Sequence, residues 1–170
     1  RFANWMVNGQ GSGSTETGAY TLNGATSGIF LAIAGAQVYI PTEDEWYKAA
    51  YYNAANQTYS LYPNGQDTIT RADANYDYSF YETTNVGTYS GDPSSYGTFD
   101  QGGNVDEWND MVSSGRWGSW RGLRGGSWVD FDLNLESTGS WGQDPTSKSE
   151  YRGFRLASVP EPSSLVLTML

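Results

Sequence analysis

The segment Arg121-Gly-Leu-Arg-Gly-Gly-Ser-Trp128 is the stretch of this chain that most strongly indicates its fold. A short strand is predicted over Leu123 to Val129, and a second one over Tyr151 to Ala157. Much of the remaining sequence is rich in turn-forming residues, and no fixed-period repeat is present. The sequence therefore predicts an α+β fold with few regular elements and much ordered loop.

A helix is predicted to begin after Pro41. Thr42 can cap its free amides, Glu45 can complete a capping box, and acidic residues fill the first turn. The residues expected on its packing face are Trp46, Ala49 and Ala50, with Tyr47 and Tyr51 on the flanks.

The segments around this helix carry different signals. Asn8 to Gly28 is rich in Gly, Ser, Thr and Asn and is predicted to be a loop. Ile29 to Ile40 is an apolar, β-branched and aromatic run, which predicts a buried strand or an extended core segment. Tyr62-Pro-Asn-Gly65 is a strong turn signal.

Composition limits the class of protein. The 170 residues suit one domain, and its core is expected to contain many Trp, Tyr and Phe rings because 15% of the chain is aromatic. With 19 acidic and 9 basic residues, the formal charge of −10 disfavours binding to nucleic acid or to an anionic membrane. Acidic chains often bind Ca²⁺, but simple solubility explains the same charge.

The chain contains no cysteine and no histidine. Disulfides, thiolate catalysis and cysteine-based zinc sites are therefore excluded. The commonest general base and the imidazole metal ligand are missing as well. We accordingly expect no copper or iron centre.

Seven motifs resemble, in order and approximate spacing, the formylglycine-generating enzyme (sulfatase-modifying factor) family. They are Pro41–Ala50, Tyr62–Gly65, Ala74–Tyr76, Thr83–Val86, Gly103–Trp108, Arg124–Trp128 and Gly153–Arg155. The resemblance covers residues 1 to 157. It implies a variant of the C-type-lectin fold with little regular secondary structure.

The same resemblance implies that this member is not an enzyme. Catalytic relatives carry two cysteines after the Gly-Gly-Ser-Trp element, bind copper(I) and oxidise a cysteine of sulfatases. Those two positions fall on Asp130 and Leu135 here. Ergothioneine-type relatives hold non-haem iron with histidines, which this chain lacks.

The family's structural calcium sites are carried over only in part. For a first site the resemblance implies side-chain oxygens of Asp100 and Glu107 and carbonyl oxygens of Gly103 and Val105, an oxygen set suited to Ca²⁺. For a second site it implies Asn75 and the carbonyl of Tyr76, with Asp77 as the acidic partner. The alternative for Glu107 is a buried acid paired with Arg121 or Arg124.

Tryptophans in Gly/Ser-rich loops are candidate contact residues. Trp117, Trp120 and Trp141 can stack on sugar rings or serve protein–protein contacts equally well. Trp108 and Trp128 lie inside fold motifs, and core packing is the favoured interpretation for both.

The two ends of the chain carry separate expectations. Arg1 to Met6 resembles the tail of an amphipathic helix, so we expect further sequence upstream of a domain at residues 1–158. Residues 159–170, with Val159-Pro-Glu-Pro162, resemble the start of a PEP-CTERM sorting signal. That family's signal marks bacterial export to the envelope or exterior. The membrane span is expected to be missing, since the apolar run is much shorter than about 20 residues.

These observations leave three functional hypotheses. The first is a non-enzymatic, exported bacterial structural or interaction protein that self-assembles into a surface layer, fibre or matrix component, or binds other cell-surface proteins. The second is a calcium-dependent, lectin-like module that binds a ligand or glycan. The third is an enzyme with a metal centre unlike that of the family. Ordered polymers would favour the first, and calcium-dependent glycan binding by the monomer would favour the second.

Overall fold

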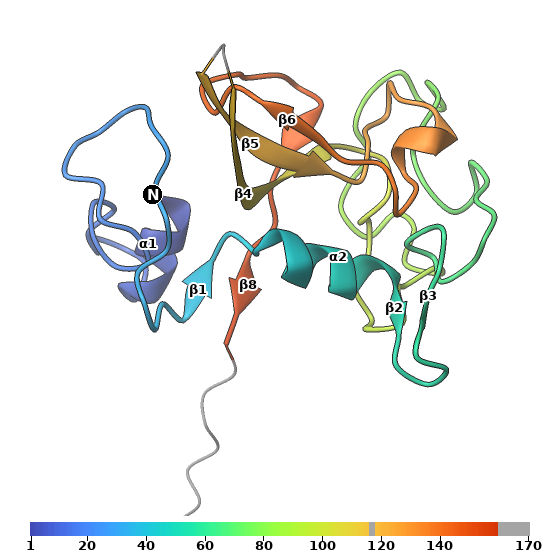
Figure 1. Ribbon diagram of the computed structural model, residues 1–170, viewed down its shortest axis with the longest axis horizontal. Helices are drawn as coiled ribbons and strands as arrows, with labels where there is room; N and C mark the ends of the chain where they lie inside the picture. The colour runs from blue at the N-terminus through green and yellow to red at the C-terminus, as the bar shows by residue number, and fades with distance from the viewer. Residues whose placement is uncertain (116–117, 160–170) are drawn as a thin grey trace, which may run out of the picture. The chain divides into compact units, whose positions relative to one another are not determined.

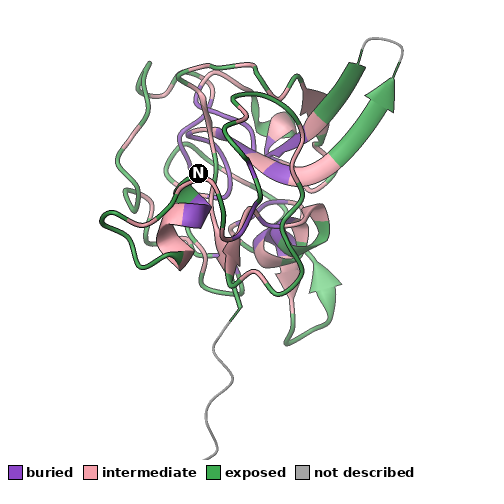
Figure 2. Ribbon diagram, turned by 90° about the vertical axis from the view of Figure 1, so that its left-hand side faces the viewer, coloured by how far each residue is buried: buried purple, intermediate pink, exposed green. Residues whose placement is uncertain are grey.

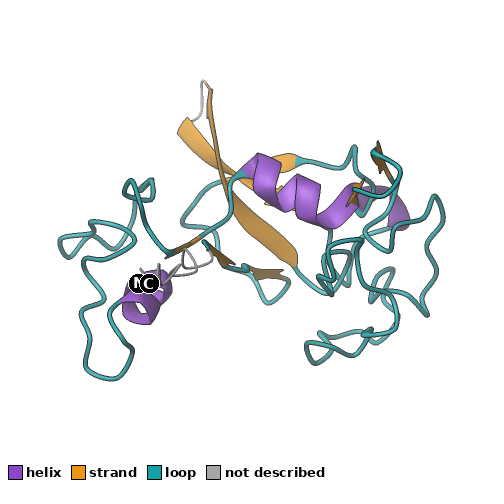
Figure 3. Ribbon diagram, turned by 90° about the horizontal axis from the view of Figure 1, so that it is seen from below, coloured by secondary structure: helices purple, strands orange, loops and turns teal. Residues whose placement is uncertain are grey.

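The computed structural model describes residues 1–115 and 118–159, and loops make up most of them (Figure 3). The helices are α1 (Phe2–Val7), α2 (Glu43–Tyr51) and the 3₁₀ helix η1 (Asp132–Asn134). The strands are β1 (Val38–Tyr39), β2 (Tyr52–Asn53), β3 (Thr58–Tyr59), β4 (Asp106–Gly115), β5 (Gly118–Arg124), β6 (Trp141–Gln143), β7 (Arg152–Gly153) and β8 (Ala157–Ser158). The predicted α+β, loop-rich class is confirmed. No helix in the described ranges is long and apolar enough to cross a membrane.

The chain forms two compact units. The first contains Arg1–Gly24, Phe30–Tyr39 and the chain from Leu156 onward, and the second contains Ala25–Ile29 and Ile40–Arg155. Figure 1 follows both units along the chain and labels α1, β1 and β8 in the first. The second unit holds all the candidate site residues that the structure describes.

The first unit is organised around the buried side chain of Asn4. Its Nδ2 donates to the carbonyl oxygens of Thr15 (2.8 Å) and Tyr20 (3.0 Å), and its Oδ1 accepts from the Tyr20 amide (2.7 Å). One amide side chain thereby satisfies three backbone groups of the predicted loop Asn8–Gly28.

The prediction of a buried strand or core segment over Ile29–Ile40 is wrong. Only Val38 and Tyr39 form a strand, which pairs with β8, and Leu31 is 65% exposed. Gly35, at φ 82°, interrupts the extended backbone. A continuous apolar run becomes a buried strand only when other elements cover both of its faces, and no strand among the described residues pairs with the segment before Val38.

The second unit contains a four-stranded sheet in the order β6-β5-β4-β7, of which Figure 1 labels β6, β5 and β4. β4 and β5 are an antiparallel hairpin, β6 pairs antiparallel with β5, and β7 pairs in parallel with β4. β5 ends at Arg124, earlier than the predicted strand end at Val129. Gly125 and Gly126 follow at φ 91° and 69°, and this backbone conformation cannot continue a strand.

Helix α2 begins as the sequence predicts. The Thr42 Oγ1 accepts from the Glu45 amide (3.1 Å), and the Glu45 side chain accepts from the Thr42 amide (2.9 Å), so the capping box is confirmed. Trp46 and Ala50 are buried as expected. Tyr51, predicted on the flank, is also buried, and its hydroxyl donates to the Leu135 carbonyl (3.0 Å).

The core uses aromatic rings, as the composition predicts. One buried cluster contains Trp46, Ala50 and Tyr51, and a second contains Tyr62, Ala74, Tyr76 and Leu135. Figure 2 shows the buried residues gathered at the base of the β4–β5 hairpin, at α2 and in the loops beside them. The predicted turn is present, since the Gly65 amide donates to the Tyr62 carbonyl (3.1 Å).

Close backbone contacts between loops require glycine at Gly103. This residue lies at φ 74°, and a Cβ there would stand 2.3 Å from the Asn75 carbonyl oxygen. The same contact allows the Asn104 amide to donate to the Asn75 carbonyl (2.7 Å). Two loops that are distant in sequence are therefore held together at this point.

Candidate functional site

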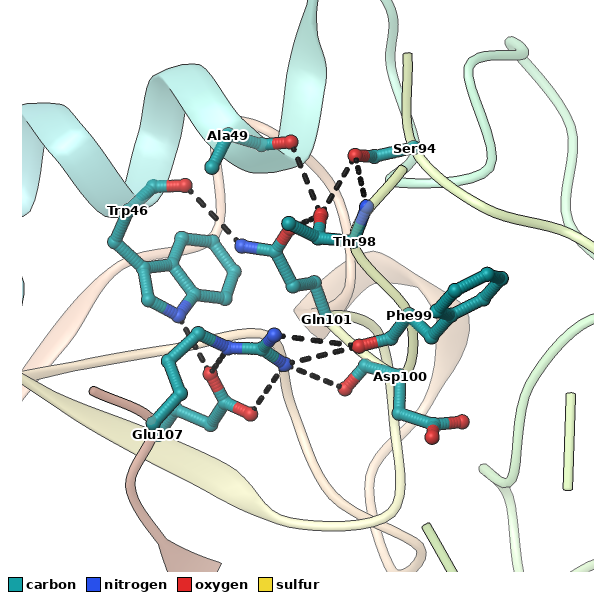
Figure 4. A network of polar contacts seen from close by, with 9 residues as sticks. Trp46, Ala49, Ser94, Thr98, Phe99, Asp100, Gln101 and Glu107 are labelled. Atoms are coloured by element: carbon teal, nitrogen blue, oxygen red, sulfur yellow. Dashed lines mark hydrogen bonds and ion pairs between the residues drawn. The ribbon is translucent and has the colours of Figure 1, made fainter. Parts of the chain in front are cut away.

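A buried carboxylate, Glu107, belongs to the polar network in Figure 4. Arg155 donates to both of its oxygens, with Nη2 at 2.6 Å from Oε1 and Nε bonded to Oε2. The Trp46 indole Nε1 donates to Oε2 at 2.6 Å. Two donors from different elements therefore balance a charge that is removed from water.

The network extends from Arg155 into the loop before β4. Arg155 Nη2 donates to the carbonyls of Phe99 (3.2 Å) and Asp100 (3.1 Å). Gln101 donates to the Trp46 carbonyl (3.3 Å), which ties the same loop to α2. One guanidinium thus joins the chain end of the second unit, this loop and β4 (Figure 4).

The alternative interpretation of Glu107 as a buried acid paired with an arginine is correct, but the predicted partners, Arg121 or Arg124, are wrong. Arg124 pairs instead with Glu43 and lies 4.9 Å from the Tyr47 ring centroid. Arg121 donates to the Asp110 carbonyl at 2.6 Å. Both Glu107 oxygens accept instead from Arg155, which is 48 residues away in sequence.

The oxygens of the first predicted calcium site have other partners in this structure. Both Glu107 oxygens accept from Arg155, and the Asp100 carboxylate accepts from the Gly87 amide (2.6 Å). The Gly103 carbonyl accepts from the Val105 amide (2.8 Å). A guanidinium in contact with Glu107 disfavours a second cation, so these residues do not fit Ca²⁺ as they stand. Calcium here stays a prediction, and it requires Arg155 to withdraw.

The second predicted calcium site fits in part. The Asn75 side chain is buried, and its Oδ1 has no hydrogen-bond partner among the described residues. The Tyr76 carbonyl, however, accepts from the Ser79 amide (3.1 Å), and Asp77 pairs with Arg71. Within residues 1–115 and 118–159, no three His, Cys, Asp or Glu side chains gather to hold a metal. Asn75 therefore offers one suitable oxygen, while Asp77 has a different partner.

Both positions that carry cysteine in catalytic relatives have structural contacts here. The Asp130 Oδ2 accepts from the Ser127 amide (2.9 Å) and the Ser127 hydroxyl (2.5 Å). Leu135 is 0% exposed and packs with Tyr62 and Tyr76. Asp130 thus stabilises the turn after the glycine pair, and Leu135 fills the core.

Next to Asp130 lies a second buried carboxyl, Asp106, which sequence reasoning missed. Asp106 is 4% exposed, and its Oδ1 has no hydrogen-bond partner among the described residues. The pKa of Asp106 is raised to about 7, first by burial and then by the nearby Asp130 charge, while Arg152 opposes the shift. The only sequence signal was its position between two motif residues, which does not show burial.

A small hollow of 110 Å³ lies beside this part of the structure. Its lining residues are Tyr81, Glu82, Thr83, Trp128 and Glu150. Trp128 is buried, as its place in a fold motif predicts, and Tyr78 meets its ring edge-on at 5.8 Å. The hollow is acidic and partly aromatic, and holds no cysteine or histidine.

The structure separates the three candidate tryptophans. Trp117 lies outside the described residues. Trp120 is 39% exposed on β5. Trp141 is half-buried on β6, where it pairs with Leu123. Sequence reasoning also missed an exposed tyrosine group beside α2, in which Tyr59 lies 5.2 Å from Tyr47 and 5.0 Å from Tyr52 between ring centroids.

The Glu107–Arg155 pair predicts an asymmetric pair of substitutions. Arg155→Met leaves a buried charge without its partner and should lower the free energy of unfolding by about 3–5 kcal/mol. Glu107→Gln leaves the more exposed Arg155 and should cost less, about 1–3 kcal/mol. Urea unfolding followed by tryptophan fluorescence, in the presence of a chelator, gives both values. The double variant should recover part of the loss; strictly additive effects would contradict a direct pair.

Asp106 predicts a pH dependence of stability. Its folded pKa of about 7 lies above the usual 3.8, so its stabilising contribution is full below about pH 4 and is lost as the pH rises through 7. Wild-type stability should therefore fall over this range, by at most roughly 4 kcal/mol. Asp106→Asn should remove this fall, and Asp132→Asn, at an exposed carboxyl, should keep it. Identical pH profiles for Asp106→Asn and wild type, measured by thermal unfolding with a chelator, would contradict the burial argument.

Comparison with known proteins agrees with this architecture. Residues 1–159 match the model of the sulfatase-modifying factor enzyme 1-like domain family. Among solved structures, Treponema denticola variable protein 1 has 28% identity and a TM-score of 0.62, covering 77% of this chain and 51% of that one. The crystal structure of CarF has 25% identity and a TM-score of 0.62, covering 76% and 51%.

A third solved structure, PvdO from Pseudomonas aeruginosa, supports the fold alone, at 19% identity and a TM-score of 0.53, covering 70% of this chain and 51% of that one. No curated protein matches the chain. The aligned part is about half the length of each of these three structures. The loop-rich architecture is that of the formylglycine-generating-enzyme-like variant of the C-type-lectin fold. The chain therefore belongs to the sulfatase-modifying factor enzyme 1-like domain family.

Proposed function

We propose that this chain is a non-enzymatic interaction module of an exported protein. The observation that carries the proposal is the use of Asp130 and Leu135. Asp130 accepts two hydrogen bonds from Ser127, and Leu135 is a core residue. Both positions therefore serve the fold in place of the thiolates that bind copper in catalytic relatives.

The full sequence supports the same conclusion. No cysteine is present to supply a copper thiolate, and no histidine is present to hold iron. The acidic groups near Asp130 do not replace them, because carboxylates prefer hard cations over copper(I).

A copper and iron titration tests the non-enzymatic role. The purified chain, titrated anaerobically with copper(I) and separately with iron(II), should bind neither above a protein-free control. Incubation of the copper sample with a sulfatase-type cysteine peptide in air should leave the thiol unchanged by mass spectrometry. A catalytic family member serves as the positive control. Conversion of the peptide cysteine to formylglycine by this chain would refute the proposal.

The β4–β5 hairpin supports self-association as the form of interaction. β7 pairs with β4 only at Asp106 and Glu107. β6 pairs with β5 only at Arg121–Leu123. Beyond these contacts Ser113–Gly115 and Gly118–Trp120 are exposed (Figure 2) and, among the described residues, pair only with each other. Unpaired strand edges are templates for another strand.

Charge favours the same surface. The segment from Met111 to Arg124 contains no Asp or Glu, although the chain as a whole carries a charge of −10. Two copies can therefore approach along this hairpin without placing carboxylates opposite one another.

Trp120→Glu tests this surface. The wild-type chain should form larger species as its concentration rises in sedimentation velocity, and ordered assemblies in electron microscopy. Trp120→Glu adds a charge at the exposed hairpin and should remain monomeric. Val86→Glu is the matched control, since Val86 is 90% exposed in a loop, and it should associate like wild type. A wild-type chain that stays monomeric at every concentration would contradict self-association.

Export belongs to the proposal through Val159-Pro-Glu-Pro162, which resembles a sorting motif. Residues 160–170 lie outside the described part of the chain. A surface or matrix location suits a chain without cysteine, because its stability does not depend on the redox state of its surroundings.

A further inference from the structure

A polar groove is lined by residues that were not predicted as site residues. Its volume is 390 Å³, within the range of about 300–1,000 Å³ that is usual for small-ligand sites. One wall is the β2–β3 hairpin and the other is the loop that follows the Tyr62 turn. The side chains that line it include Asn53, Asn56, Thr58, Tyr59, Gln66 and Asp67.

Internal hydrogen bonds hold several of these side chains and leave other groups of theirs available. The Asn53 Oδ1 accepts from the Ala55 amide (3.0 Å), and the Asn56 Oδ1 accepts from the Thr58 hydroxyl (2.7 Å). The two Nδ2 groups have no partner among the described residues. Two amide donors are therefore oriented before any ligand arrives, which lowers the entropy cost of binding.

The opposite wall is also fixed. The Asp67 Oδ1 accepts from the Leu61 amide (3.1 Å), and the Gln66 carbonyl accepts from the Tyr62 amide (2.9 Å). The second Asp67 oxygen and the Gln66 side-chain amide have no partner in the described ranges. This wall adds a strong acceptor and a group that both donates and accepts.

Tyr59 supplies a flat apolar surface at the groove. It is 51% exposed, and its ring is supported by Tyr47 at 5.2 Å and by Tyr52, its cross-strand partner, at 5.0 Å. A ring held by two neighbours loses little freedom when a ligand stacks on its remaining surface.

We propose that this groove binds a neutral glycan. A pyranose ring presents an apolar C–H face for Tyr59 and neighbouring hydroxyls, each of them donor and acceptor, for the Asn53, Asn56, Gln66 and Asp67 groups. No Lys or Arg lines the groove, so it offers no counter-ion to phosphate or uronic acid. Binding by these side chains needs no calcium.

The experiment is a titration of the full chain with neutral di- and trisaccharides of glucose, galactose, mannose and N-acetylglucosamine. Saturation-transfer and chemical-shift NMR should detect binding, with a dissociation constant on the order of 1 mM for the best probe. Addition of a chelator should leave the affinity unchanged. Loss of binding with the chelator would overturn the groove in favour of a calcium-dependent site.

Three variants locate the site. Tyr59→Ala should weaken binding by at least about tenfold, and Gln66→Ala, whose side chain has no internal partner, by about three- to tenfold. Tyr81→Ala is the matched control: Tyr81 is 77% exposed, lies outside the groove and should bind like wild type. Because Tyr59 also supports other rings, thermal unfolding must show that each variant is folded. The Gln66→Ala result tests the groove even if Tyr59→Ala does not fold.

Two further results would overturn the proposal. One is the absence of binding by any probe at concentrations well above the expected constant. The other is binding that Tyr81→Ala reduces and Gln66→Ala does not. This inference goes beyond self-association, and the titration is repeated with Trp120→Glu. Glycan binding by that monomeric variant would show that the groove functions without the assembly surface. The two proposals can therefore fail independently of each other.

Discussion

The second unit depends on the pairing of one buried acid. Glu107 lies inside the protein, and an isolated carboxylate there would be prohibitively costly. Arg155 and Trp46 meet this requirement together, and in doing so they fix the loop before β4 against helix α2. The aromatic cluster around Trp46 is therefore positioned by the hydrogen bond to the Glu107 carboxylate as well as by packing.

The contacts that hold the scaffold and the two positions that carry cysteine in catalytic relatives involve largely different residues. The contacts that hold the fold use backbone amides, Glu107 and the glycines at close approaches, and none of them needs a thiolate. Asp130 and Leu135 make contacts that a catalytic pair of cysteines would have to surrender. The fold is thus compatible with binding through surfaces that the catalytic relatives need not share.

Short-range features were predictable from sequence, and features that depend on what covers a residue were not. The capping box of Thr42 and Glu45 and the turn ending at Gly65 are set by neighbouring residues and were predicted correctly. The partner of Glu107 was not, because several arginines were available and the chosen one is distant in sequence. Ile29–Ile40 was wrongly predicted to be buried, because an apolar segment is buried only where other elements cover it. The burial of Asp106 was missed, because an acidic residue can also be covered by its neighbours. The groove beside Tyr59 arises from two separate loops and had no motif to indicate it.

The short pairing of β1 with β8 determines how the chain responds to tension. β8 is the last strand of the described residues, and its ladder with β1 consists of the pairs Val38–Ser158 and Tyr39–Ala157. A pull on the chain beyond Val159 would peel these pairs open one after the other, at low force. It would next reach Arg155, whose guanidinium is bonded to Glu107, Phe99 and Asp100 at once. The β1–β8 pairs would therefore separate first, and the Arg155–Glu107 ion pair would resist further extension before the four-stranded sheet is loaded.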